Sequence, residues 1–356
     1  MHLVILPGDG IGPEICAATR TVLEALDDRL GLGLSFETHA TGFPALKTEG
    51  TTFPAAAFDA AAAADGIVLG PVSHNDYPPK AEGGLNPSGE LRLALDLYAN
   101  IRPARSRAGL RHWGRTPLDL VILRENTEGF YADRSMHLGP GEFMPTPDMA
   151  LAMRKITAGA CRRIARQAFE LARDRGRHVT AVHKANVLRV SDGLFLRETR
   201  KLAALFPDVA YDEQLVDSMA ALLVRDAARF DVVVTTNMYG DILSDLAAEL
   251  SGSLGLAGSL NAGTDHAMAQ AQHGSAPDIA GQDKANPASL ILSAGLLLDW
   301  LGRRHARPEY GRAADAVEAA VDALLANPAA RTADLGGTLG TTGFTDALCA
   351  ELSLRL

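Results

Sequence analysis

The alternation of short apolar runs with longer helical stretches is the feature that most constrains this chain. Five brief runs are rich in Val, Ile and Leu and predict buried strands: residues 2–6, 66–70, 118–124, 178–183 and 231–236. The stretches between them predict helices over residues 13–28, 55–65, 149–175, 241–250, 287–301 and 312–325. Because such alternation builds mostly parallel sheets with helices on both faces, we expect an α/β fold.

The sequence gives less direct evidence of the domain organisation. The 356 residues are enough for about two domains. No Pro/Ser-rich linker separates them, so we expect a chain that leaves one domain and later returns to it. Residues 129–147 are rich in Gly, Pro and Met and fit neither periodicity, which indicates an exposed arm or hairpin.

Charge and composition exclude several classes of protein. The net charge of −9 and the lack of a basic stretch argue against nucleic-acid binding, but a few arginines could still bind a small anion. Three scattered cysteines, Cys16, Cys161 and Cys349, without CxxC spacing indicate reduced thiols. No stretch approaches the roughly 20 apolar residues of a membrane span, and the N-terminal run is too short for a signal peptide. We expect a soluble cytoplasmic protein.

A glycine-rich turn lies between the first strand and the first helix. Residues 7–14 read PGDGIGPE, with Pro13 suited to the first turn of a helix. Alternate glycines allow a tight turn and a close approach to a ligand. The motif is not the dinucleotide fingerprint GxGxxG, and by itself it favours an ordinary strand–helix turn over a ligand loop.

Arginines and acids supply the candidate chemistry. Arg92, Arg102 and Arg124 could clamp carboxylates, although any one of them could be an ordinary surface residue. Asp241 and Asp245 are four apart, which places both on one helix face. With a third acid, for which Asp217 is a candidate, they could bind Mg²⁺ or Mn²⁺. Equally, Asp241 could be a helix N-cap and Asp245 a first-turn acid.

Two further side chains could move protons. Lys184 ends a predicted strand and could act as a base, and the phenol of Tyr131 could donate a proton. Most lysines are simply solvated, and a tyrosine in a loop often just packs.

Six segments in this order resemble the β-decarboxylating dehydrogenases, which act on isocitrate, isopropylmalate, homoisocitrate and tartrate. They are residues 8–12, 97–103, 124–131, 183–188, 237–245 and 273–278. The resemblance runs from Leu3 to about Leu348. It implies two open parallel or mixed sheet domains flanked by helices, an isopropylmalate-dehydrogenase-like fold that is not a Rossmann fold. Residues 1–98 with 252–356 would bind NAD, and residues 99–251 would form the dimerisation, metal and substrate domain.

The resemblance also implies roles for the site residues. The three arginines would hold the malate carboxylates, with Asn186 in the same substrate set. The three aspartates would bind Mg²⁺ or Mn²⁺. Lys184 would take the hydroxyl proton during hydride transfer, and Tyr131 would protonate the enolate left by decarboxylation. Lys184 and Asp217 would come from the neighbouring subunit, so the family's site requires a homodimer.

The cofactor expectation depends on one short segment. Asp278 and Ile279 occupy positions where NADP-using relatives carry a basic and an aromatic residue. A carboxylate accepts hydrogen bonds from ribose hydroxyls and repels a 2′-phosphate, so we expect NAD. The other candidate cofactor contacts are Ser73, His273, Gly274, Ser275, Ala276 and Asn286.

The stretch before Arg92 departs from the relatives. Isopropylmalate enzymes present leucines there, whereas this chain has Asn86 and Ser88, which favour a polar or small C3 substituent. Against this, Val187 matches a residue of the isopropyl pocket. We expect NAD-dependent oxidative decarboxylation of a 3-substituted malate, isopropylmalate-dehydrogenase-like. Isocitrate, homoisocitrate and tartrate or D-malate dehydrogenases are alternatives. A histidine-ligated hydroxythreonine-phosphate dehydrogenase and a non-catalytic regulatory subunit fit less well.

Overall fold

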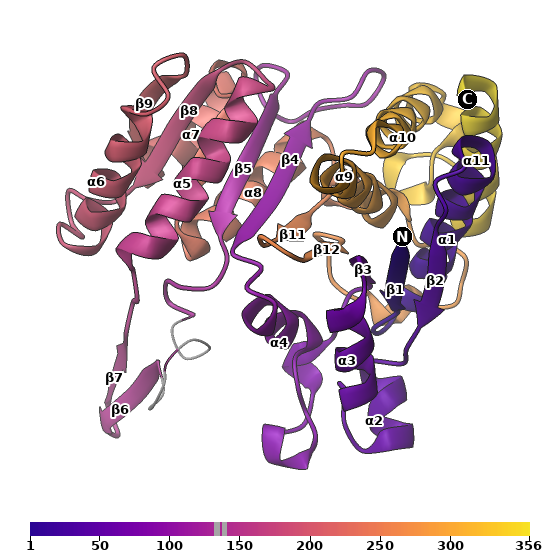
Figure 1. The fold of residues 1–356 in the computed structure, drawn as a ribbon, viewed down its shortest axis with the longest axis horizontal. Coiled ribbons are helices and arrows are strands. Elements are labelled where there is room, and N and C mark those ends of the chain that lie inside the picture. The colour runs from indigo at the N-terminus through magenta and orange to yellow at the C-terminus, as the bar shows by residue number, and fades with distance from the viewer. Residues whose placement is uncertain (132–135, 137–140) are drawn as a thin grey trace.

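The chain forms one large mixed sheet in the computed structural model, which describes residues 1–131, 136 and 141–356. The strand order is β2-β1-β3-β12-β11-β4-β5-β10-β8-β9 (Figure 1). β4 runs antiparallel to β5 and β11, and β11 antiparallel to β12. The strands are β1 His2–Leu6, β2 Ser35–Thr38, β3 Gly66–Leu69, β4 Ala99–Arg105, β5 Asp119–Glu125, β8 His178–His183, β9 Ala210–Leu215, β10 Val232–Thr235, β11 Leu260–Ala262 and β12 Ala267–Gln270.

Helices cover both faces of this sheet. Leu3 of β1 packs with α1, α9, α10 and α11, whereas its neighbour Val4 packs with α3. In β10, Val232 faces α5 and α6, and Val233 faces α7 and α8. The expected α/β architecture is therefore confirmed. The helices are α1 Gly12–Leu30, α2 Phe43–Glu49, α3 Ala55–Ala63, α4 Pro87–Ala94, α5 Ala158–Arg173, α6 Ser191–Ala203, α7 Val216–Asp226, α8 Asn237–Ser251, α9 Ala288–His305, α10 Pro308–Ala326 and α11 Thr341–Arg355.

The two expected sheets are joined edge to edge through β11 and β4, where Leu260 pairs with Ile101. The five strands from residues 1–98 and 252–356 lie on one side of this junction, and the five from residues 99–251 lie on the other. The division into two functional domains stays a prediction. A candidate site at the junction would draw on both groups of strands.

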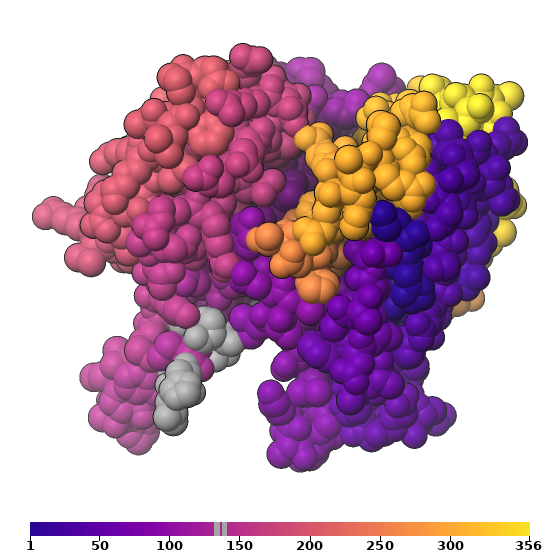
Figure 2. Space-filling view, in the orientation of Figure 1, coloured from indigo at the N-terminus to yellow at the C-terminus, as the bar shows by residue number. Residues whose placement is uncertain are grey.

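The helix predicted over residues 149–175 is wrong at its start. Met149–Ala152 is strand β7, which pairs with β6 (Glu142–Thr146) in a hairpin that projects from the body (Figures 1 and 2). The helix begins only at Ala158, because the Thr157 hydroxyl accepts a hydrogen bond from the Ala160 amide and caps it. The predicted arm thus continues to Ala152. Its residues 132–135 and 137–140 lie outside the described part of the chain.

Helix α8 begins four residues earlier than predicted. Its N-cap is Thr236, so Asp241 lies inside the helix and is not a cap. Asp241 and Asp245 are therefore both presented from regular helix, one turn apart. Within the described ranges, no helix is both long and apolar enough to span a bilayer.

Candidate active site

A pocket of about 250 Å³ opens at the junction of the sheet. It gathers side chains from α4, β4, β5, α8 and the segment after β12. Its lining includes these predicted site residues: Asn86, Ser88, Arg92, Arg102, Arg124, Tyr131, Asp241, His273 and Gly274. The structure thus brings together residues that are as much as 188 positions apart, from Asn86 to Gly274.

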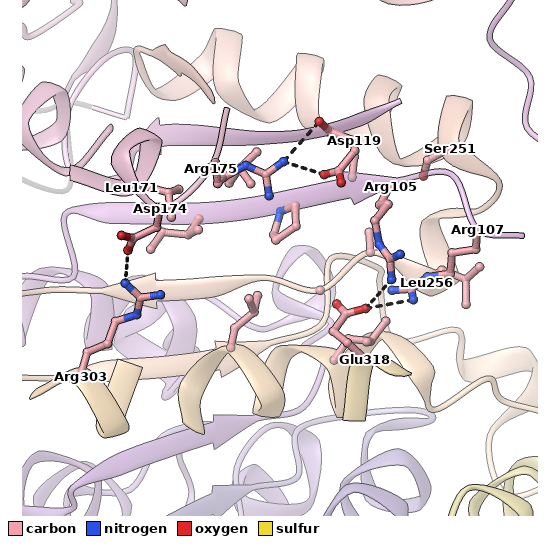
Figure 3. A pocket seen from close by; sticks show the side chains of 18 residues that line it. Arg105, Arg107, Asp119, Leu171, Asp174, Arg175, Ser251, Leu256, Arg303 and Glu318 are labelled. Atoms are coloured by element: carbon pink, nitrogen blue, oxygen red, sulfur yellow. Dashed lines mark hydrogen bonds and ion pairs between the residues drawn. The ribbon is translucent and has the colours of Figure 1, made fainter. Parts of the chain in front are cut away.

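A second cavity, of about 450 Å³, lies on the opposite face of β4 (Figure 3). Ile101 and Arg105 line it, whereas Arg102 faces the first pocket, as the alternation of a strand requires. Its arginines form ion pairs, as those of the first pocket do: Arg105 Nη2 lies 2.6 Å from Asp322 Oδ2, and Arg175 Nη2 lies 2.6 Å from Asp119 Oδ1. None of the predicted site residues lines this cavity, so we place the site in the first pocket.

Two buried guanidiniums define the charge of the pocket. Arg102 is 8% exposed and Arg124 is 4% exposed. Arg124 Nε donates to Asn237 Oδ1 at 2.8 Å, which fixes the plane of the guanidinium. Burial, together with the nearby charge of Arg102, lowers the pKa of Arg124 to about 10. Arg124 therefore remains charged at neutral pH, and two buried guanidiniums side by side suit an anion with more than one acidic group.

Two carboxylates from α8 converge beside these arginines. Arg102 Nη1 donates to Asp241 Oδ1 at 3.1 Å and to Asp245 Oδ1 at 3.3 Å, so both oxygens reach a common point. Arg124 also donates to Asp241 Oδ1, and the Tyr131 hydroxyl lies 3.4 Å from Asp241 Oδ2. In this chain the point that they share is the Arg102 guanidinium nitrogen. Carboxylate oxygens are the ligands that Mg²⁺ and Mn²⁺ prefer, so the chemistry of these two donors suits a divalent cation, to which one chain supplies two ligands.

The remaining predicted catalytic residues lie elsewhere on the chain. Lys184 Nζ donates to Asp217 Oδ1 at 2.5 Å, and this bond lowers the pKa of the Asp217 carboxyl. Neither residue lines the pocket, and Asn186 and Val187 beside them are exposed. Across residues 1–131, 136 and 141–356, no three acids, histidines or cysteines are gathered to hold a metal. A single chain thus carries the predicted site in two separate pieces.

The predicted cofactor residues surround the glycine-rich turn. The Ile11 amide donates to the Ser275 carbonyl at 2.8 Å, and a Cβ at Gly10 would lie 1.9 Å from that oxygen. Gly10 is therefore required for docking the two segments together. Ser73 and Ser275 join their hydroxyls at 2.7 Å.

The rest of the cofactor set falls into buried and exposed members. Burial lowers the pKa of His273, which keeps the ring neutral at neutral pH. Asn286 Nδ2 donates to Asp334 Oδ2 at 3.0 Å. Asp278 is exposed, whereas Ala276 and Ile279 are half-buried, so the Asp278 carboxylate is accessible to a ribose hydroxyl.

Sequence reasoning missed three polar residues that shape this region. Asp9 is buried and accepts hydrogen bonds from the amides of Phe43 and Ser73 and from the Tyr77 hydroxyl, so it fixes the loop that follows β3. Gln270 and Gln272 line the pocket from the end of β12. The position of Asp9 within the glycine turn was a usable signal. The glutamines gave none, because only strand pairing brings them to the arginines.

The comparison with family models identifies the class of protein. Residues 2–348 match the family described as isocitrate/isopropylmalate dehydrogenase. The chain belongs to this family. The sequence-based assignment to the β-decarboxylating dehydrogenases is thereby confirmed.

Individual relatives match over nearly the full length. The chain is 41% identical to an isocitrate/homoisocitrate dehydrogenase of Thermus thermophilus, covering 99% of this chain and 98% of that one. It is 41% identical to a 3-isopropylmalate/3-methylmalate dehydrogenase of Methanocaldococcus jannaschii, covering 96% of each. It is 39% identical to a probable isocitrate dehydrogenase [NAD] subunit alpha of Caenorhabditis elegans, over 99% and 92%. The Thermus and Methanocaldococcus relatives are equally similar to this chain but are named for different substrates. Overall similarity therefore does not identify the substrate of this chain.

A solved structure supports the fold. The isocitrate dehydrogenase of Methylococcus capsulatus superposes with a TM-score of 0.85, at 37% identity and with 99% of each chain covered. The family match and the structural match therefore agree on the fold.

Proposed function

We propose that this protein oxidises and decarboxylates a 3-substituted malate, with NAD as hydride acceptor and Mg²⁺ or Mn²⁺ as the metal, and that it works as a homodimer. The observation that carries the proposal is the pocket in which Arg102 and Arg124, both buried, lie against Asp241. Paired cations there suit the carboxylates of the substrate, and the α8 acids suit the metal.

The chain's own residues divide the chemistry among them. Arg92, Arg102 and Arg124 bind the two malate carboxylates and orient the C2 hydrogen. Asp241 and Asp245 hold the cation, with Asp217 of a second copy as the third acid. When bound, NAD accepts the hydride and the cation polarises the hydroxyl oxygen and stabilises negative charge on it.

Two proton transfers complete the reaction. Lys184 of the second copy takes the proton of the C2 hydroxyl as the hydride leaves C2. The product is a ketone at C2, next to C3, which bears the carboxylate that is lost. Loss of CO₂ leaves the electron pair on C3, and Tyr131, whose hydroxyl lies beside Asp241, donates the proton there.

Three observations support a homodimer. Lys184 and Asp217 pair outside the pocket, where a second copy could use them. The β6–β7 hairpin exposes apolar side chains, including Met144 at 63%, and a two-stranded hairpin is marginally stable alone. Ile242 on α8 is 59% exposed next to the metal-ligand candidate Asp241. A partner that covers these surfaces would also complete the site.

The choice of NAD is supported by charge. Asp278 is exposed in the turn beside the glycine-rich loop, where a carboxylate repels the 2′-phosphate of NADP. The Caenorhabditis relative carries NAD in its name, which agrees with this choice.

The test is a screen of NAD reduction in the presence of Mn²⁺. The panel contains malate, tartrate, isocitrate, homoisocitrate and 3-isopropylmalate, each assayed for both NADH and CO₂. We expect at least one acid to give equal amounts of the two products, and we expect EDTA to abolish turnover and added Mn²⁺ to restore it. Activity insensitive to the chelator, or NADH without CO₂, would contradict the proposal.

A further inference from the structure

Gln270, the last residue of β12, lies between the substrate arginine of α4 and the serine that precedes it. The Ser88 hydroxyl donates to Gln270 Oε1 at 2.9 Å, and Arg92 Nη2 donates to the same oxygen at 3.1 Å. All three residues line the active-site pocket. The Ser88 proton is therefore directed at Gln270 and not at the substrate.

These contacts fix which end of the amide is the acceptor. A guanidinium has only N–H donors, so the atom facing Arg92 must be the carbonyl oxygen of Gln270. The amide nitrogen, Nε2, is then the end that remains. Among the described residues it has no hydrogen-bond partner, although Gln270 is half-buried in the pocket. Gln270 thus retains an N–H donor beside the arginines.

Asn86, two residues before Ser88, likewise uses its amide oxygen as an acceptor and keeps its amide nitrogen as a donor. Its Oδ1 accepts from the Gly89 amide at 3.2 Å and caps α4, which leaves its Nδ2 as the donor end. Asn86 lines the same pocket. The wall formed by α4 and the end of β12 therefore carries amide donors next to the positively charged Arg92.

We propose that Gln270 is a specificity-determining residue whose Nε2–H donates to the C3 substituent and so selects malates whose substituent carries a hydrogen-bond acceptor, above all a carboxylate. This inference rests on the proposed function. A hydrocarbon substituent would bury the amide N–H without a partner, and sites built to hydrogen-bond a substrate discriminate strongly against analogues that lack the group.

The test compares isocitrate with 3-isopropylmalate in wild type and in Gln270→Glu. A glutamate keeps an acceptor for Ser88 and Arg92, but it replaces the donor with a second acceptor. We expect wild type to have the higher kcat/KM for isocitrate. We expect the substitution to lower the ratio of kcat/KM for isocitrate to kcat/KM for 3-isopropylmalate about 10- to 100-fold, mainly by raising KM for isocitrate.

The matched control is Gln167→Glu, the same chemical change on α5 outside the pocket. In this control, the ratio of kcat/KM for isocitrate to kcat/KM for 3-isopropylmalate should equal the wild-type ratio. An active wild type that prefers 3-isopropylmalate, or an unchanged ratio in Gln270→Glu, overturns this inference and leaves the proposed function intact. If no malate is turned over, the proposed function fails. Calorimetric binding of the two acids in Mn²⁺ still tests Gln270, because equal affinities would overturn its role.

Discussion

At the scale of single residues, the site depends on how closely α8 approaches β5. A Cβ at Gly240 would lie 2.6 Å from Arg124 Cβ and 3.1 Å from Arg124 Cα. Only a hydrogen fits between the helix and the strand at this position. The close approach lets Arg124 reach Asp241, the next residue of the helix. Gly240 therefore positions both charged groups without touching a substrate itself.

Gly240→Ala should lower kcat/KM about 10- to 100-fold, because displacing Arg124 by about 1 Å misplaces the substrate carboxylate. Alanine is a better helix former than glycine, so α8 should persist. Steady-state kinetics and far-UV circular dichroism measure the two effects. Gly159→Ala, where an added Cβ has no atom within 4 Å, is the control and should retain wild-type kinetics. Unchanged kinetics in Gly240→Ala would mean that the site tolerates a wider spacing.

At the scale of elements, one buried acid joins α5 to α6. Glu198 of α6 has a side chain only 1% exposed. Its carboxylate accepts hydrogen bonds from Arg162 of α5 at 2.9 Å and from Lys201 at 2.9 Å. The bonds from Lys201 and Arg162 lower the pKa of Glu198 to about 2. The charged form is therefore the one that the folded helix pair favours.

This shift predicts a pH dependence of stability. The pKa of Glu198 is depressed below its unfolded value of about 4.3, so its contribution is complete above that pH and is lost as the pH falls toward about 2. Urea unfolding at a series of pH values should show a steeper acid loss for wild type than for Glu198→Gln, which cannot titrate. Parallel profiles for the two proteins would contradict the assignment.

At the scale of the whole molecule, the predicted site is divided between two surfaces of one chain. The arginines, Asp241 and Asp245 belong to the pocket region, whereas Lys184 and Asp217 form a separate pair. A homodimer that places the pair of one copy against the pocket of the other unites the two pieces. It would also cover the exposed hairpin.

Mixing two inactive variants tests this arrangement. Lys184→Met and Asp241→Asn should each abolish NADH formation while leaving the fold and the dimer intact. Unfolded and refolded together at equal amounts, they should recover about a quarter of wild-type activity, because half of the dimers are mixed and each mixed dimer holds one intact site. Refolding each variant alone is the control. No recovery in mixtures that do form mixed dimers would place the whole site within one chain.

The sequence by itself determined the fold class, the family and the approximate positions of five of the twelve strands and six of the eleven α-helices in the described residues. Strand and helix periodicities are local, so β8 over His178–His183 was predicted to the residue. The spacing of Asp241 and Asp245 likewise implied one helix face without any tertiary information. Periodicity failed at residues 149–157, because the pairing of β7 with β6 and the Thr157 cap override the helical preference of that stretch.

Only the tertiary structure decided which side chains meet. Ser88 and Arg92 both donate to the side-chain oxygen of Gln270, which is 178 residues after Arg92, because β12 inserts beside β3. Likewise, Gly240 is needed because α8 packs on β5. Such contacts depend on strand order and on the close packing of helix against sheet, which no local pattern of apolar residues encodes.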